Sequence, residues 1–588
     1  MQGSRRSQSW LETRLRPAAW RAYVAGRRVR LPVSRGWTAA VGIIVALTAL
    51  PVGAIAFLAL SADLSTWPHL WRTILPDALK TTLVVMAGVA VMTLIAGAGT
   101  AWIVTMYRFP GRGLLDRLLV IPLAVPTYIV AYCYVDLLDF AGPLQSGLRE
   151  IFGWHTPRDY WFPNIRSTGG AIFLLSAVLY PYVYLAARAS YVQQSICVLE
   201  VARTLGRTPT GTFFNVALPL ARPALAAGTA LVLMECLNDL GAVQHLGVET
   251  LSAAIYTTWL QRSNLGGAAQ IALMALVVVL VLFAIERRAR GNRQFHHTTG
   301  RYRSIPFSDL DGWWAVGAIT ACLVPFVAGF VLPIAVLATN AVAYSGDATS
   351  PALWHAAGNS VLLAVLAAAV TVLLAVILAY ARRIAGSRFV RMAVRLAGVG
   401  YALPGTVLAL GLLIPLAALD NRLDALSRAV FNLPLGLMIT GSLLALVIAF
   451  SIRFLAVSLG AIEAGMERVS PNLDAAARTL GATPLATMGR VHLPLLLPAL
   501  GSAALLVFVD AMKELPTALL LRPFNFETLA THVYSLASLE LFESAGIGAL
   551  AIVIVGLLPV LALHQTIESG RTGQRGGQQS GPKAAATA

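Results

Sequence analysis

The chain has 588 residues, of which 57% are hydrophobic and only 12% are charged. An ordinary soluble domain carries about 25% charged residues, so the composition excludes a soluble globular protein and predicts a polytopic protein of the lipid bilayer. The formal net charge of +17 is compatible with nucleic-acid binding. The arginines stand beside apolar runs, however, where they set membrane orientation, and we therefore predict no nucleic-acid partner.

Apolar runs long enough to cross roughly 30 Å of hydrocarbon predict twelve membrane spans, six in each half of the chain. The first six are expected at 37–60, 81–106, 118–138, 170–187, 224–243 and 268–285. The second six are expected at 313–339, 360–381, 396–419, 433–455, 499–519 and 545–563. The predicted fold class is therefore all-α, with two six-helix repeats.

Five segments follow from this pattern. We expect a basic arm (1–36), a first repeat (37–286, core from about 77), a linker (287–312), a second repeat (313–566, core from about 356) and a disordered tail (567–588). The basic stretch before the first span is too long for a cleavable signal peptide, so the arm is predicted to remain attached.

Clusters of arginine assign the orientation of the spans. They occur in the N-terminal arm and in alternate loops, at 108–117, 287–293 and 382–391. Loops enriched in Lys and Arg face the cytoplasm. The sequence therefore predicts that both termini are cytoplasmic.

One polar stretch of about twenty-five residues occurs twice, about 275 residues apart. The first copy reads Ala-Arg-Thr-Leu-Gly at 202–206, followed by Thr208-Pro209 and Leu218-Pro219. The second reads the same at 477–481, followed by Thr483-Pro484 and Leu493-Pro494. Further matched segments, such as Glu-Thr-Leu at 249–251 and 527–529, keep nearly the same offset. The chain is thus a tandem duplication, with parallel repeats related by an axis along the membrane normal.

Each copy of the repeated stretch predicts a helix, a sharp turn and a second helix. Gly206 can adopt the left-handed conformation that ends a helix, Thr208 can cap the next one and Pro209 suits its first turn. Pro219 is expected to stop that second helix, which leaves a short helix on the membrane surface. The second copy is predicted to fold alike, at Gly481, Thr483, Pro484 and Pro494.

The spacing of Glu200-Val201-Ala202, Gly206 and Leu218-Pro219 resembles the cytoplasmic EAA loop of permease subunits of binding-protein-dependent ABC importers. In that family the loop is a coupling helix that sits in a groove of the ATP-binding subunit. The resemblance assigns this role in the first copy to Glu200, Ala202, Gly206, Thr208, Pro209 and Pro219. In the second copy it assigns the role to Asp474, Ala477, Gly481, Thr483, Pro484 and Pro494.

The second copy departs from this pattern at its acidic residue. Ala475 stands where the first copy has Glu200, and the acid of the second copy, Asp474, comes one residue earlier. The two loops are therefore not assumed to grip their ATPase subunits identically.

Within the family, the segments 234–241, 512–517 and 521–526 most resemble the fused permeases of ferric iron importers. The resemblance implies a type I importer fold in the bacterial inner membrane and a channel for iron(III) delivered by a periplasmic binding protein. Relatives in the same superfamily carry thiamine, phosphonates, polyamines or oxyanions, and these substrates stay open as alternatives.

The distribution of lysine indicates that the ATPase is a separate protein. A Walker A loop needs a Gly-Lys pair to hold phosphates, but Lys80, Lys513 and Lys583 are the only lysines and none follows a glycine. We therefore expect two partner ATP-binding subunits that hold ATP and magnesium, a separate solute-binding protein, and no cofactor in this chain.

Four acidic residues within the fifth and eleventh spans are candidates for a substrate path. Glu235 and Asp239 lie four residues apart on one helix face, and Asp510 and Glu514 occupy the matching positions. Each costs roughly 2.5–3.5 kcal/mol at a membrane centre, which favours an aqueous or protein-lined vestibule for a cation. Alternatively, these acids pair with Lys513 or Arg453 or cap helices. Three tyrosines, Tyr128, Tyr132 and Tyr134, are either further lining or interfacial anchors.

The sequence has no Ser-His-Asp grouping with supporting spacing, no His pair at metal-ligand spacing and no metal-ligand cluster, so we predict no catalytic residue and no metal site. The four cysteines, Cys133, Cys197, Cys236 and Cys322, are predicted to be packing residues. A secondary transporter would also show parallel repeats and acids within spans, and it remains the alternative from another class.

Overall fold

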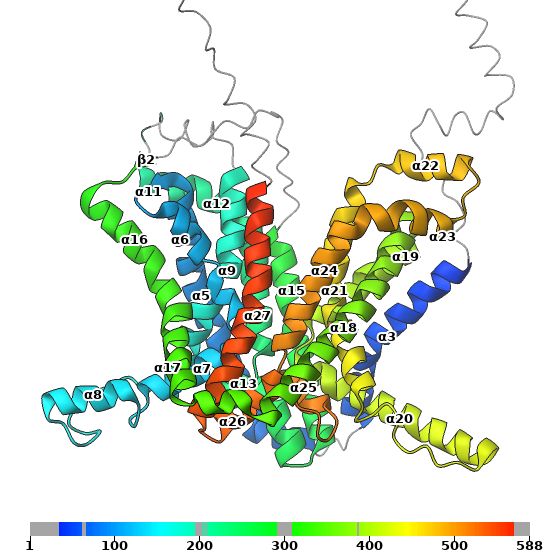
Figure 1. The fold of residues 1–588 in the computed structure, drawn as a ribbon, viewed down its shortest axis with the longest axis horizontal. Helices are drawn as coiled ribbons and strands as arrows, with labels where there is room; N and C mark the ends of the chain where they lie inside the picture. Colours follow the sequence, from blue (N-terminus) through cyan, green and yellow to red (C-terminus); the bar gives the residue numbers. More distant parts are fainter. Residues whose placement is uncertain are drawn as a thin grey trace, which may run out of the picture. The chain divides into compact units, whose positions relative to one another are not determined.

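The computed structural model describes residues 35–61, 66–193, 204, 206, 208–290, 308–384 and 387–569. Helices dominate this part of the chain, which confirms the predicted fold class (Figure 1). One strand pair occurs among these residues, formed by β1 (Tyr107–Arg108) and β2 (Ser308–Asp309) in parallel, with Tyr107 opposite Ser308. The free cysteines Cys133, Cys236 and Cys322 are buried, as packing residues should be, while Cys197 lies outside the described residues.

Within the described ranges, fifteen helical elements of different lengths precede β2 and form the first half of the chain. They are α3 (Arg35–Ser61), α4 (Thr66–Thr73), α5 (Leu75–Met106), α6 (Arg112–Leu118), η1 (Ile121–Ala124), α7 (Thr127–Leu138), α8 (Pro143–Phe152), α9 (Thr168–Gln193), α11 (Pro209–Thr212), η2 (Phe213–Ala217), α12 (Leu218–Asn238), α13 (Gly241–His245), α14 (Leu251–Tyr256), η3 (Thr257–Gln261) and α15 (Leu265–Arg290).

The second half follows a similar order, and its α22 matches a part of the first half that lies outside the described residues except for Thr204. Its elements are α16 (Gly312–Phe326), η4 (Val327–Val331), α17 (Leu332–Ala343), η5 (Ser345–Thr349), α18 (Pro351–Ile384), α19 (Arg388–Ala397), η6 (Gly398–Ala402), α20 (Gly405–Phe431), α21 (Leu443–Arg468), α22 (Pro471–Thr479), α23 (Pro484–Thr487), η7 (Met488–His492), α24 (Leu493–Lys513), α25 (Pro516–Leu521), α26 (Leu529–Ser538) and α27 (Phe542–Ser569).

Eleven helices in the described ranges are long and apolar enough to cross a membrane, or twelve when one bent pair is counted as a span. The bent pair is the third expected span, in which Arg112–Ala124 and Thr127–Phe152 meet at 94°. The prediction of one continuous helix for the third span is therefore wrong. Pro126 has no N–H group to continue the helix, and Val125 and Pro126 are extended, so the helix breaks there.

The ninth and tenth spans begin about ten residues later than the hydropathy pattern predicts. They form Gly405–Phe431 and Leu443–Arg468, and the apolar residues that follow Phe431 lie in a loop. Two aspartates of α20 bind this loop: Asp424 accepts from the amides of residues 435 and 436, and Asp420 from those of 438–440. These bonds hold the backbone out of a helix despite its apolar side chains.

Contacts divide the chain into two compact units. The small unit takes its described residues from Met1–Ala49, Val372–Val399 and Leu455–Ala503, and the large unit takes them from Leu50–Thr371, Gly400–Phe454 and Ala504–Ala588. Long helices such as α18 and α24 contribute to both. The domain boundaries expected from the sequence repeats stay a prediction.

Helices α5, α9 and α12 pack side by side in the large unit (Figure 1). Their close approach depends on small residues. A Cβ atom on Gly97 of α5 would lie 2.8 Å from the backbone of Tyr180 and of Tyr184 in α9, and one on Gly228 of α12 would lie 3.1 Å from the carbonyl oxygen of Tyr182. This is the packing that small residues permit between membrane helices.

The small unit has its own apolar core. Val41 and Ile44 of α3 are buried with residues of α18, α19, α21 and α24, and Trp37 packs on Tyr380 with ring centroids 5.2 Å apart. Ser387 caps α19 by accepting a hydrogen bond from the amide of Val390. Helix α19 is amphipathic: its arginines are exposed, and its apolar face covers the core with the buried residues Val390, Ala393, Val394 and Ala397.

The duplication is visible in matched tertiary contacts of the large unit. The hydroxyl of Thr82 on α5 accepts a hydrogen bond of 2.9 Å from the amide of Leu251, at the start of α14. The hydroxyl of Ser360 on α18 accepts one of 2.6 Å from the amide of Leu529, at the start of α26. Each half thus anchors the same short helix to the same long helix, which supports the repeat read from the sequence.

The expectation that Pro219 and Pro494 stop a short helix is wrong. Thr210–Asn238 and Pro484–Lys513 each form one long helix, with a π-helical turn, η2 or η7, directly before the proline. The amides of Leu218 and Leu493 donate to carbonyls five residues back. This wider turn removes the usual clash between a proline ring and the preceding turn, so the helix continues into the membrane span.

Candidate functional site

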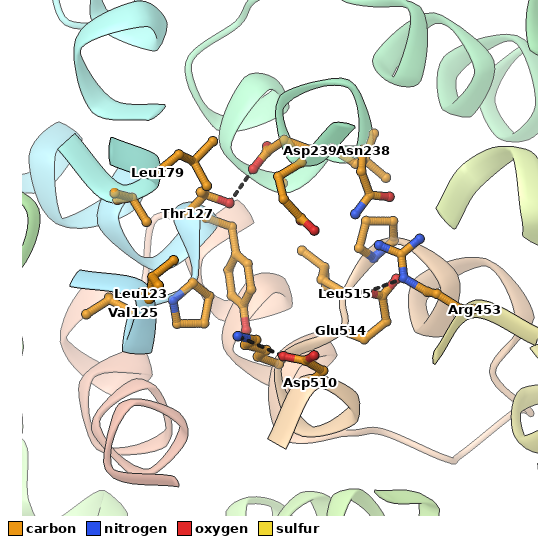
Figure 2. Close-up of a pocket in the computed structure, with 18 of the residues that line it drawn as sticks. Leu123, Val125, Thr127, Leu179, Asn238, Asp239, Arg453, Asp510, Glu514 and Leu515 are labelled. Atoms are coloured by element: carbon orange, nitrogen blue, oxygen red, sulfur yellow. Dashed lines mark hydrogen bonds and ion pairs between the residues drawn. The ribbon is translucent and has the colours of Figure 1, made fainter. Parts of the chain in front are cut away.

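A polar cavity lies in the large unit, where α12 and α24 end and α7, α13 and α25 begin (Figure 2). It measures about 110 Å³, several times the roughly 10–15 Å³ needed to hold one water molecule. All four predicted path residues line it, together with two cationic side chains. The polar lining is Thr127, Tyr128, Tyr182, Glu235, Asn238, Asp239, Tyr401, Arg453, Asp510, Lys513 and Glu514.

Two of the four acids are in ion pairs with the bases that the sequence suggested. Arg453 Nε lies 3.1 Å from Glu514 Oε2, and Lys513 Nζ lies 3.0 Å from Asp510 Oδ1 (Figure 2). The Arg453 and Glu514 side chains are only 4% and 7% exposed, so neither charge has water as its main partner. The alternative of ion pairing is therefore correct for Asp510 and Glu514.

Asp239 and Glu514 also cap the short helices that follow the fifth and eleventh spans. Asp239 Oδ1 accepts hydrogen bonds from the amides of Ala242 (2.9 Å) and Val243 (3.3 Å), and its other oxygen accepts one from the Thr127 hydroxyl. Glu514 Oε1 accepts from the hydroxyl (2.8 Å) and the amide of Thr517. These two spans therefore end at Asn238 and Lys513, several residues before their expected ends.

Hydrogen bonds across the cavity join residues from the two halves of the sequence. The Tyr401 hydroxyl donates to Glu235 Oε1 at 2.7 Å, and the Gly405 amide donates to Asn238 Oδ1 at 2.7 Å. Sequence reasoning missed Tyr401, Asn238 and Gly405 as site residues. The signal available in the sequence was a pair of prolines, Pro126 and Pro404, which are 278 residues apart, like the other matched segments, and stand directly before α7 and α20.

Of the three tyrosines predicted as lining or as interfacial anchors, Tyr128 lines the cavity and its side chain is 6% exposed. Its hydroxyl has no hydrogen-bond partner within the described part of the chain. Tyr134 instead donates to the carbonyl of Ala328, and Tyr132 stacks on Phe542. All three are buried, so the interpretation as anchors at the membrane surface is wrong.

The cavity lining carries an excess of negative formal charge, because four carboxylates face only Arg453 and Lys513. The carboxylates do not converge on one point: no group of three or more His, Cys, Asp or Glu side chains arranged to hold a metal ion is found in the described ranges. The cavity can therefore attract a cation through its charge, without a preformed ligand cage.

The second copy of the repeated stretch lies in the small unit and has the predicted turn. Gly481 adopts φ +78°, and Thr483 caps the following helix by accepting from the amide of Ala486 at 3.3 Å. Ala477 is buried within α22, and Asp474 is buried beside it. The left-handed glycine and the threonine cap are thus confirmed, while the function assigned to the segment stays a prediction.

The first copy of the repeated stretch shows the same turn in the large unit. Gly206 also adopts φ +78°, Thr208 Oγ1 accepts from the amide of Gly211 at 3.1 Å, and Pro209 begins α11. Glu200 and Ala202 lie outside the described residues.

Comparison with known proteins agrees with this architecture. Residues 93–289 match the family described as binding-protein-dependent transport system inner membrane component. The chain is 30% identical over 216 residues to PhnU of Salmonella choleraesuis (strain SC-B67), a transport system permease protein named for 2-aminoethylphosphonate, and the match covers 74% of that protein and 36% of this chain. The chain belongs to this family and is a permease component of a binding-protein-dependent transporter, with no catalytic role of its own.

Two further relatives show which form of permease this is. The molybdenum transport system permease protein ModB of Escherichia coli K12 is 26% identical over 231 residues, which is 95% of ModB and 38% of this chain. The Fe(3+)-transport system permease protein FbpB 2 of Haemophilus influenzae is 24% identical over 505 residues, 91% of its own length and 84% of this chain. With its internal repeat, the chain is therefore a fused permease of two halves and similar to the ferric transport permeases.

Proposed function

We propose that the chain forms the translocation path of an ATP-driven iron(III) importer. The observation that carries the proposal is the cavity of about 110 Å³ between matched elements of the two halves, with its excess of carboxylates. Hard carboxylate oxygens suit a hard cation. The similarity to FbpB 2 over most of the chain supports the same substrate.

The cavity would alternate between two sides of the membrane. The bonds from Tyr401 to Glu235 and from Gly405 to Asn238 join the sequence halves, so movement of one half against the other must break them. A periplasmic binding protein would deliver the substrate. Two separate ATPase subunits would bind ATP and magnesium, and this chain would hold no cofactor.

The repeated segments around Gly206 and Gly481 would pass ATPase movement to the spans. Because each Thr-Pro turn leads without interruption through a π-helical turn into the fifth or eleventh span, a displacement at the turn acts directly on a helix that ends at the cavity. This assignment requires both segments, and both termini, to face the cytoplasm of a bacterial inner membrane.

The test reconstitutes the chain in vesicles with its ATPase subunits and an iron(III)-loaded binding protein. Glu235→Gln combined with Asp510→Asn is expected to lower radioactive iron uptake at least tenfold, whereas Glu249→Gln, at an exposed position, leaves it unchanged. Wild-type uptake by the double variant would overturn the acidic path.

Import of an oxyanion or a phosphonate is the second candidate, favoured by the cationic groups of Arg453 and Lys513 in the cavity and by the similarity to ModB and PhnU. Stimulation of ATP hydrolysis by a molybdate-loaded or phosphonate-loaded binding protein, and not by the iron-loaded one, would select this candidate.

A further inference from the structure

Asp474 of α22 is fully engaged by partners inside the small unit. Its Oδ2 lies 2.8 Å from Nε and 2.7 Å from Nη2 of Arg383, and its Oδ1 lies 2.6 Å from Nε2 of His492. Asp474 is 8% exposed and His492 is fully buried. Both carboxylate oxygens are thus used within the chain, and little of the group is left for another protein.

The partners of Asp474 join four helical elements. Arg383, near the end of α18, also donates to the carbonyls of Met466 (2.6 Å) and Val469 (2.9 Å) at the end of α21. His492 belongs to η7, the π-helical turn that leads into α24. We call these three residues, Arg383, Asp474 and His492, the Asp474 network. The network fixes α22 to the ends of α18, α21 and α24 that are expected to face the cytoplasm.

Tyr380 strengthens this network from α18. Its ring packs on the imidazole of His492, with centroids 5.4 Å apart, and its hydroxyl donates to the carbonyl of Pro484 at 2.7 Å. The turn that begins the eleventh span is thus held to α18 on two sides.

Asp474 can reach these partners because it comes one residue before Ala475, the position that matches Glu200 of the first copy. A shift of one residue along an α-helix turns a side chain by about 100° around the axis. Asp474 and Ala477 form the buried face of α22, whereas Leu473, Ala476 and Leu480 are exposed. The acid one residue earlier than the position of Glu200 therefore points into the unit.

Three leucines are exposed on this segment, beside the polar side chains of Asn472, Arg478 and Thr479. Leu473, Leu480 and Leu485, which we call the leucine face, are 41%, 86% and 65% exposed. The first two lie between the candidate spans Leu443–Arg468 and Pro484–Lys513, outside the lengths that cross lipid. Exposed leucines at such a position indicate burial against a protein partner, and the ATP-binding subunit of the transporter is the partner that the family requires.

We propose that Asp474 is a positioning residue that holds α22, the proposed coupling helix of the second half, against the membrane helices. The leucine face of this segment, and not an acidic side chain, then docks the ATPase. The proposal rests on the proposed coupling function of this segment. It is specific to the second half, because the position that matches His492 in the first half is Ala217, which has no imidazole.

The experiment uses the complete transporter with tagged ATPase subunits. Asp474→Ala and His492→Ala are expected to co-purify with the ATPase at wild-type stoichiometry, while the stimulation of ATP hydrolysis by loaded binding protein falls at least fivefold. His492→Gln, whose Nε2 can reach the same carboxylate, is expected to restore most of the stimulation. Leu480→Asp is expected to lower ATPase recovery at least fivefold.

Three outcomes would overturn the proposal. Loss of ATPase recovery in Asp474→Ala together with normal stimulation in His492→Ala would mean that the acid contacts the ATPase. Equal loss of stimulation in His492→Gln and His492→Ala would mean that the bond to Asp474 is not what matters. Normal recovery and stimulation in Leu480→Asp would instead show that this segment does not dock the ATPase, which contradicts the coupling function itself.

Discussion

Glu235 and Tyr401 stand 166 residues apart in sequence and share a hydrogen bond of 2.7 Å across the cavity of the large unit. One residue comes from the end of the fifth span and the other from the helix break that precedes α20. A hydrogen bond to a charged group contributes about 1.5–3 kcal/mol, enough to bias a two-state equilibrium between closed and open halves.

Removing this hydrogen bond should favour the open arrangement. Tyr401→Phe keeps the ring and deletes the donor, so we expect ATP hydrolysis in the absence of binding protein to rise several-fold. Tyr344→Phe, at a position that is 46% exposed, is the matched control. Unchanged basal hydrolysis in Tyr401→Phe would show that the bond does not restrain the halves.

The ion pair between Arg453 and Glu514 should matter for stability, because both side chains are buried. Arg453→Met leaves a buried carboxylate without its cation and is expected to cost about 3–5 kcal/mol, seen as a clear fall in Tm in detergent. Arg453→Met with Glu514→Gln should recover much of the loss. Arg428→Met is the control: it breaks the ion pair with Asp424, but the Arg428 side chain is 59% exposed, so Tm should change little.

The turn at Gly481 should depend on its left-handed backbone and not on space. A Cβ atom there meets nothing within 4 Å, but φ is +78°, so Gly481→Ala is expected to cost about 1–2 kcal/mol in the turn and to reduce stimulated ATP hydrolysis. Gly489→Ala is the control, because Gly489 also has open space and no positive φ. Equal activity of the two variants would contradict a requirement for this turn.

The loop after α8 should respond to acid through Asp159. Hydrogen bonds from the amides of Thr156 and His155 hold the pKa of Asp159 below its ordinary value of 3.8. A depressed folded-state pKa stabilises the loop above the unfolded-state pKa, and this stabilisation is lost as the pH falls through the folded value. The protection of the His155 and Thr156 amides, relative to their intrinsic exchange rates, should therefore fall as the pH drops below the ordinary value of 3.8, and Asp159→Asn should flatten that profile.

Hydropathy and the internal repeat were sufficient to predict an all-helical membrane protein of two matched halves. These features depend on local chemistry: a bilayer requires long apolar helices, and a duplication keeps its residue offset. The conformations at Gly206, Gly481, Thr208 and Thr483 were also predictable, since a glycine after a helix and a Thr-Pro pair before the next one act through neighbouring backbone atoms.

Tertiary structure alone decided where the polar groups of these helices find their partners. The sequence left open whether Glu514 faces a substrate or a base, and Arg453, 61 residues earlier, became its partner. It also placed Pro219 and Pro494 as helix stops, although a π-helical turn carries the helix past each one. The reason is physical: a buried charge must be matched by whatever the packing brings near it, and helix continuity depends on the turn before the proline as much as on the proline.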